Sequence, residues 1–263
     1  MMKRGSKVYF GIIMAFLYLP IIYLIAYSFN DGKTSVWKGF TLKWYEALFH
    51  DSQIIGSLYN TLIIAVIASV VATILGTAAA IGIYNFKGGV RSAILNVSNI
   101  PIINPEIVTG VSLMLLFTFA GTLLGFEMGF ATVLLAHIGF CTPYVILSVT
   151  PRLRRMDGSL YEAALDLGCS PVQAFFKVVL HELMPGISSG LLISFTYSLD
   201  DFVITYFTRG SKFQTLPIQI YTMTHQRINP KVNALSALMF VVIFVILIIS
   251  NSVGARRERK AVR

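Results

Sequence analysis

The longest uncharged stretch of the chain runs from Ser52 to Phe86 and contains no Asp, Glu, Lys or Arg. It exceeds the roughly 20 apolar residues that a helix needs to cross the hydrocarbon core of a bilayer. The composition agrees, since 56% of the residues are hydrophobic, 13% are charged and the mean hydropathy is +0.73. These values lie far from those of a soluble globular domain. We therefore expect an integral membrane protein.

Six apolar, nearly uncharged segments predict six transmembrane helices in an all-α membrane protein. They lie at about residues 8–29, 57–84, 100–124, 129–150, 186–208 and 233–254, and we treat residues 1–263 as one transmembrane domain with a cytoplasmic loop at 151–185. The first apolar run is longer than that of a typical signal peptide, so we expect it to be retained. The tripeptide Ala26-Tyr27-Ser28 leaves cleavage open.

The positions of the positive charges predict that both termini are cytoplasmic. An even number of spans places both ends on one side of the membrane, and both ends are rich in Lys and Arg. Cytoplasmic segments of membrane proteins collect these residues, which accounts for the net charge of +9 without a nucleic-acid partner. The exception is the outer loop at 209–231, which is basic and contains no acid.

The loop after the fourth span is predicted to form a short helix. Ser159 and Glu162 have the spacing of a capping box, so a helix is expected to begin after Ser159, and Gly168 supplies the left-handed residue that ends it. Its apolar face is small at Ala163 and Ala164, which leaves room for the backbone of another protein. A helix this short needs tertiary or partner contacts to be stable.

A second helix is predicted directly after the first. Ser170 and Gln173 again have the spacing of a capping box, and Pro171 occupies the first turn, where no backbone donor is needed. Large apolar residues line one face of this helix, and we expect them to pack against the cytoplasmic ends of the spans: Val172, Phe175, Phe176, Val179 and Leu183.

The same loop resembles the signature of permease subunits of binding-protein-dependent ABC importers. The pattern stands here as Glu162-Ala163-Ala164, then Gly168, then Val178-x-Leu180. This chain has His181 where the family commonly has Pro, which leaves the end of the second helix open. The similarity covers nearly the whole chain and is closer still to spermidine/putrescine permease C subunits, through YLPIIYLIAYSFN at 18–30, HIGFCTPYVIL at 137–147 and SFTYSLDDFV at 194–203.

The resemblance implies the architecture and partners of a type I ABC importer permease in the bacterial inner membrane. The expected partners are a second homologous permease subunit, an ATPase subunit dimer, an extracytoplasmic polyamine-binding protein and the lipid bilayer. Glu162, Ala163, Ala164 and Gly168 would form the coupling helix that contacts the ATPase. The chain would carry no cofactor, with ATP and Mg on the ATPase. The basic loop at 209–231 would dock an acidic binding protein.

No motif predicts that the chain itself is an enzyme. Gly32-Lys33-Thr34 is a fragment of a phosphate loop, but Tyr27 stands where the first glycine belongs. The four histidines and two cysteines have no metal-ligand spacing, and no paired nucleophile and base is evident. His137 is the one histidine inside an expected span.

Two adjacent acids, Asp200 and Asp201, lie inside the fifth expected span. A carboxylate at bilayer depth is costly and faces a bundle interior or an aqueous path. Neighbouring residues on a helix point about 100° apart, so one acid is expected to face the path while the other meets a neighbouring helix or a break in the backbone. Tyr197 and Phe202 stand beside them and offer aromatic faces to ammonium groups. A purely structural role for the pair is the alternative.

Glu106 is expected at the cytoplasmic start of the third span, either capping that helix or contacting a gate. Two functional alternatives stay open at this point. The same importer fold could carry a different cargo, such as ferric iron, thiamine or an anion. A secondary transporter would keep the spans without needing the two cytoplasmic helices. The sequence does not distinguish spermidine from putrescine.

Overall fold

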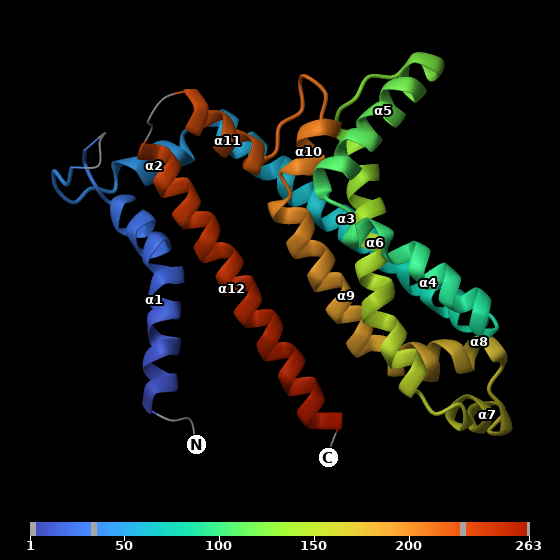
Figure 1. Cartoon of the computed structure of the whole chain (residues 1–263). Coiled ribbons are helices and arrows are strands. Elements are labelled where there is room, and N and C mark those ends of the chain that lie inside the picture. Colours follow the sequence, from blue (N-terminus) through green and yellow to red (C-terminus); the bar gives the residue numbers. More distant parts are fainter. Residues whose placement is uncertain (1–3, 33–35, 227–229, 262–263) are drawn as a thin grey trace. The chain divides into compact units, whose positions relative to one another are not determined.

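The computed structural model describes residues 4–32, 36–226 and 230–261, and the named elements in these ranges are all helices (Figure 1). They are α1 (Arg4–Tyr27), α2 (Lys43–Phe49), α3 (Ser52–Tyr84), α4 (Gly88–Ile103), α5 (Glu106–Leu124), α6 (Phe130–Arg155), α7 (Ser159–Asp166), α8 (Pro171–Ala174), the π-helix η1 (Phe175–Val179), α9 (Leu180–Asp200), α10 (Val203–Thr208), α11 (Leu216–Gln226) and α12 (Pro230–Ala261). The all-α prediction is confirmed.

Within the described residues, five helices are long and apolar enough to cross a membrane. They are Val8–Tyr27, Ser52–Tyr84, Glu106–Leu124, Phe130–Arg155 and the continuous run Pro171–Asp200. A sixth, shorter apolar helix covers Pro230–Val245. Their exposed apolar side chains, including Phe16, Ile74 and Leu123, suit contact with lipid tails.

The chain divides into two compact units. One comprises Met1–Tyr59 and Leu216–Ile249, and its core gathers Leu48 of α2, Ile54 of α3, Leu216 of α11 and Ala234 and Leu235 of α12. Leu48 is the buried member of the short amphipathic helix α2, which explains why this helix forms against α3 rather than alone in water.

The second unit comprises Asn60–Thr215 and Ser250–Arg263, and it contains all the predicted site residues. Helix α6 packs against α9, α4 and α10, and its residues Val145 and Val149 lie in the core of this unit (Figure 1). Close approach of α3 to α6 requires Gly76, because a Cβ placed there would lie 2.6 Å from the Cβ of Val145. The small residues of this segment therefore serve helix packing, as their spacing predicts.

Two expected spans are interrupted within this unit. The segment expected at 100–124 is two helices, α4 and α5, separated at Asn104 and Pro105 because proline disfavours a helical residue before it. The segment expected at 186–208 ends its main helix at Asp200 and restarts at Val203. Broken helices at bilayer depth are tolerated where they are buried in protein or line a cavity.

Candidate translocation pocket and coupling helix

Helices α5, α6, α9 and α10 enclose a cavity of about 240 Å³ at the break between α9 and α10. It brings together four of the predicted acidic and aromatic residues and Glu106. Its lining comprises Pro101, Glu106, Thr109, Phe140, Tyr144, Tyr197, Asp200, Asp201, Phe202, Val203 and Ile204. None of these described lining residues is basic, so the cavity presents acidic and aromatic groups together.

Asp201 is held by the start of α10. Its carboxylate accepts hydrogen bonds from the backbone N–H groups of Ile204, at 3.3 Å, and Thr205, at 2.8 Å. The Thr205 hydroxyl donates a further bond of 2.7 Å to Oδ2. These bonds satisfy the free donors of a helix N-terminus, and only 6% of the side chain is exposed. Asp201 is therefore a structural anchor for the restarted helix.

His137 is the partner of Asp201 that sequence reasoning missed. Its Nε2 lies 3.4 Å from Asp201 Oδ2 and 2.9 Å from the Thr205 hydroxyl. Because that hydroxyl gives its single proton to Asp201, it must accept a hydrogen bond from Nε2. The Nδ1 atom is 2.7 Å from the Ser198 hydroxyl. The position of this histidine inside an expected span was the available signal, since polar groups there need buried partners.

Asp200 has a different environment from its neighbour. Its side chain is exposed and lines the cavity. Among the described residues, no other side chain forms a hydrogen bond with its carboxylate. The two acids diverge because Asp200 ends α9 whereas Asp201 already has an extended backbone, with φ −61° and ψ 126°. Of the pair, Asp200 is the acid that remains available to a ligand.

Glu106 lies in the first turn of α5 and lines the same cavity. The N-cap position is occupied by Pro105, and no side-chain capping bond is formed there. The expected position of Glu106 on the cytoplasmic side of the membrane stays a prediction. Within the cavity Glu106 shares the lining with Phe140 and Tyr144, which lie near the middle of α6.

Aromatic rings line the walls around these acids. Tyr144 and Tyr197 stack with ring centroids 4.5 Å apart, which joins α6 to α9. Phe202 lies 5.5 Å from Tyr206 of α10. Ring faces attract cations and also pack against methylene groups, so this lining suits an amphipathic cation.

The predicted first capping box is not formed. Helix α7 begins at Ser159 with Gly158 as its N-cap, and the Ser159 side chain makes no capping bond. Instead Asp157 Oδ1 accepts a 3.0 Å hydrogen bond from the Ser159 N–H, and bonds to Ser159 lower the pKa of the Asp157 carboxyl. Asp157 therefore accepts the hydrogen bond at the start of α7, and the Glu162 side chain is exposed.

The end of α7 and the second capping box are confirmed. Gly168 has φ +85°, the left-handed conformation that glycine adopts without strain. Ser170 Oγ accepts from the Gln173 N–H at 3.3 Å, and Gln173 Oε1 accepts from the Ser170 N–H at 3.1 Å. The predicted apolar face is mixed, since Val179 and Leu183 lie in the core while Val172 and Phe176 are exposed.

The second cytoplasmic helix does not end before the fifth span. From Pro171 the chain stays helical through the π-helix η1 and α9, passing His181 and Pro185 without a break. His181, which departs from the family pattern, therefore lies inside a helix and does not end it. The π-helix η1 has i→i+5 hydrogen bonds, so its backbone is wider and underwound relative to an α-helix, and such turns occur frequently at functional sites.

The surface of α7 is open. Ala164 is buried, whereas Glu162, Ala163 and Gly168 are exposed. Leu167, which follows α7, is 86% exposed, so this side chain is open to contact with another protein.

Two lysines of the basic loop at 209–231 have acidic partners. Lys231 Nζ lies 3.1 Å from Asp51 Oδ2, and this pair is only about a quarter exposed. Lys212 lies 3.9 Å from Glu127 in a fully solvated setting. Arg227 lies outside the described residues. These ion pairs supply a reason for the loop's charge that the sequence did not reveal.

Neither a metal cluster nor a phosphate loop is evident in the described part of the chain. No group of three or more His, Cys, Asp or Glu side chains there is placed to hold a metal ion. The fragment Gly32-Lys33-Thr34 extends into residues outside the described ranges.

A helical membrane fold with a broken span at an acidic cavity and an exposed short helix, α7, is typical of a membrane transport component. The chain belongs to the family of inner membrane components of binding-protein-dependent transport systems, whose model matches residues 72–261. It is thus a multi-pass protein of the bacterial inner membrane.

Two relatives match almost the full chain. The putrescine transport system permease protein PotI of Escherichia coli K12 is 38% identical over 254 residues, which cover 94% of this chain and 90% of PotI. The spermidine/putrescine transport system permease protein PotC of Haemophilus influenzae is 37% identical over 248 residues, which cover 94% of this chain and 95% of PotC.

Solved structures share the fold at low identity. A bacterial ABC transporter that imports the acidic polysaccharide alginate has a chain that matches with a TM-score of 0.74 at 15% identity, covering 96% of this chain and 98% of that one. The inward-facing MetNI methionine ABC transporter matches with a TM-score of 0.62 at 17% identity, covering 82% of this chain and 99% of that one. The type I importer architecture that the sequence predicted is confirmed.

Proposed function

We propose that this chain is the permease subunit of an ATP-driven polyamine importer and that Asp200 and Glu106 receive the cationic cargo. The observation that carries this proposal is that the two adjacent acids at the break in the fifth span have different contacts. Asp201 is hydrogen-bonded to the start of α10 and lies against His137, whereas Asp200 lines a cavity together with Glu106. Both relatives reported above are named for polyamine transport.

The chemistry of the cavity favours an organic cation over the alternative cargoes. Acids without a basic neighbour in the lining disfavour an anion. Ferric iron would need a cluster of hard oxygen ligands, and no group of three metal-ligating side chains occurs in the described residues. Polyamines combine ammonium groups with methylene chains, which match the carboxylates and the stacked rings of Tyr144 and Tyr197.

The exposed surface of α7 supports coupling to a separate ATPase. In this proposal ATP and Mg are bound by an ATPase dimer, and this chain holds no cofactor. Leu167, Ala163 and Glu162 would sit against the ATPase, and movement would pass through the continuous helix from Pro171 to Asp200. A self-contained secondary transporter would have no use for this surface.

The remaining partners follow from the same assignment. A second homologous permease would complete the path. An extracytoplasmic polyamine-binding protein would deliver the cargo to the outer loops. Both termini and residues 151–185 would lie in the cytoplasm, in keeping with the basic residues there.

The test is uptake of labelled putrescine and spermidine by the complete transporter in proteoliposomes. Asp200→Asn should raise the KM for uptake about tenfold or more with normal assembly, because a charge-assisted contact to the cargo is lost. Asp201→Asn should instead reduce assembly. Glu127→Gln, at an exposed acid 89% open to solvent, is the control and should transport normally.

Two results would contradict the proposal in different ways. Normal uptake by both Asp200→Asn and Glu106→Gln would remove these residues from the cargo path. Failure of the wild-type complex to import either polyamine, while it imports another solute, would refute the cargo and leave the permease assignment intact.

A further inference from the structure

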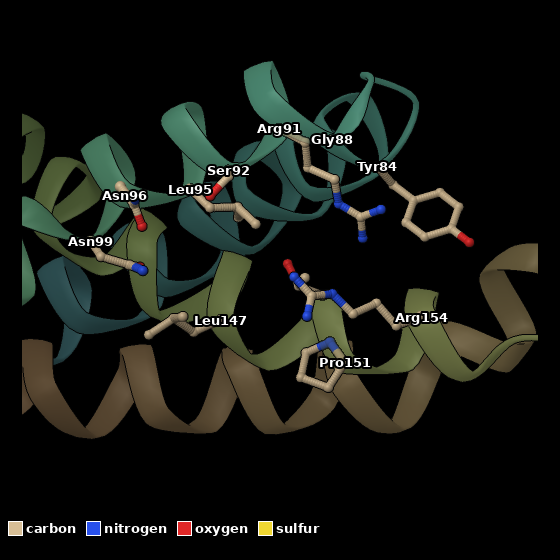
Figure 2. Close-up of a pocket in the computed structure, with 11 residues that line it drawn as sticks. Tyr84, Gly88, Arg91, Ser92, Leu95, Asn96, Asn99, Leu147, Pro151 and Arg154 are labelled. Atoms are coloured by element: carbon tan, nitrogen blue, oxygen red, sulfur yellow. The ribbon is translucent and has the colours of Figure 1, made fainter.

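A second cavity lies between α4 and α6, at the end of α6 that carries the coupling loop. Its volume is about 730 Å³, within the range of about 300–1,000 Å³ typical of small-molecule sites. Figure 2 shows the guanidinium groups of Arg91 and Arg154 lying in the space between the two helices. None of the 11 described residues that line it is acidic.

Polar groups inside this cavity lack partners. The Nε of Arg91 and the Oδ1 of Asn99 are buried, and neither forms a hydrogen bond with another described residue. Arg91 is held in place by its planar group, which lies 4.6 Å from the ring centre of Tyr84. A buried donor and a buried acceptor without partners are costly, so the wall of this cavity holds polar groups whose hydrogen bonds the described residues do not supply.

The two ends of the cavity differ in chemistry. At one end Arg91 and Arg154 offer planar forks of N–H donors, which match the oxygens of a phosphate group. At the other end Asn96 and Asn99 offer amide groups that suit hydroxyls (Figure 2). A bare phosphate ion would leave the amides unused, whereas a phosphate ester that also carries hydroxyl groups would meet both ends.

The cavity is separate from the acidic one although the two share a face of α6. Phe140 and Tyr144 line the acidic cavity, and Leu147, Pro151 and Arg154 continue along the same helix into the basic one. The basic residues repel a polyamine cation and attract an anion. Basic pockets between helices near the cytoplasmic surface are suited to the headgroups of anionic lipids.

We propose that the cavity lined by Arg91, Arg154 and Asn99 binds a hydroxyl-bearing phosphate ester. Two sources supply this chemistry: the glycerol phosphate headgroup of an anionic phospholipid and a soluble glycerol phosphate. The location beside helices that face the bilayer favours the lipid, and the experiment has one arm for each source.

The lipid arm uses the assembled membrane complex, delipidated in detergent and studied by native mass spectrometry with added phosphatidylglycerol or phosphatidylcholine. The wild type should retain phosphatidylglycerol in preference to phosphatidylcholine. The double variant Arg91→Gln/Arg154→Gln should bind it at least about tenfold more weakly. The control Arg155→Gln/Lys177→Gln removes two exposed cations that lie outside the cavity lining, and it should bind as the wild type does.

The soluble arm titrates glycerol 3-phosphate into the complex in vesicles of phosphatidylcholine alone and measures thermal stability. Stabilisation that the double variant loses would assign the site to a soluble ester; stabilisation by phosphatidylglycerol alone would assign it to the lipid. Equal behaviour of the double variant and its control in both arms would overturn the proposal.

A conservative pair keeps the test decisive if the double variant fails to assemble. Arg91→Lys retains the charge without the planar fork, and Asn99→Ala removes the unpaired acceptor. Each should weaken binding severalfold while the complex assembles normally. Wild-type affinity in both variants would refute the site.

Discussion

The imidazole of His137 lies 3.4 Å from the carboxylate of Asp201, and the two side chains are 1% and 6% exposed. This contact joins the middle of α6 to the break between α9 and α10. It explains how adjacent acids in an apolar segment can have separate roles. Asp201 is held by hydrogen bonds from α10 and lies against His137, and Asp200 stays available in the cavity.

The first prediction concerns this buried contact. His137→Phe leaves the Ser198 hydroxyl without its partner and removes the imidazole from beside the buried Asp201 carboxylate, so it should destabilise the protein by about 3 kcal/mol. His50→Phe, at an exposed histidine, should have little effect. Thermal melting of the purified complex in detergent measures the difference. Equal melting temperatures for both variants would contradict the assigned role of His137.

A second prediction concerns the close approach of α3 to α6. Gly76→Ala places a Cβ 2.6 Å from the Cβ of Val145 and should cost about 1–3 kcal/mol through overpacking. Gly82→Ala lies on the same helix with nothing within 4 Å of the new Cβ, so it should be neutral or slightly stabilising. The same melting assay separates the two, and a stable Gly76→Ala protein would show that the helices are farther apart.

A third prediction tests the ion pair between Lys231 and Asp51. Lys231→Asp should lower stability by about 1 kcal/mol, and the exchanged pair Asp51→Lys/Lys231→Asp should recover part of that loss. Full recovery is not expected, because Asp51 also accepts bonds from the first turn of α3. Lys212→Asp, in a pair almost fully exposed, should change stability little.

The same lysine tests the docking hypothesis for the outer loop. If the loop docks an acidic binding protein, Lys231→Glu should weaken docking and its dependence on salt beyond any change in stability. Unchanged docking affinity would leave the ion pair with Asp51 as the reason for the charge of Lys231.

A fourth prediction concerns the exposed surface of α7. Leu167→Ser changes a side chain that is 86% exposed, so it should leave the melting temperature of this chain unchanged. It should reduce ATP-dependent uptake and weaken co-purification of the ATPase, because an apolar anchor of the interface is lost. Leu42→Ser, at another exposed leucine, is the control for loss of apolar surface. Normal coupling in Leu167→Ser would exclude this residue from the interface.

Much of the coupling loop was predictable because its signals are local. Gly168 ends α7 in the left-handed conformation, and Ser170 with Gln173 forms the box that starts α8. Both depend on residues within one helical turn. The position of the start of α7 agrees with the prediction, but its capping box was predicted wrongly, because Asp157 rather than Ser159 accepts the hydrogen bond at the helix start.

The sequence by itself determined the class of protein, because apolar length and the position of charge respond directly to the bilayer. It also located the acidic pair, since two carboxylates in an apolar segment are evident from the sequence alone. It did not decide which acid faces the path. That depended on His137, 64 positions before Asp201, and on the restart of the helix at Val203.

The tertiary structure alone brought Glu106 to Asp200 and placed Arg91 opposite Arg154. Each pair joins helices whose meeting depends on side-chain packing, and that packing sums many weak contacts over residues distant in sequence. Ion pairs such as Lys231 with Asp51 have the same origin. Local sequence patterns therefore determined most helix ends and which segments suit lipid or water. Tertiary packing decided which charged groups have partners within the protein and which remain available to a ligand.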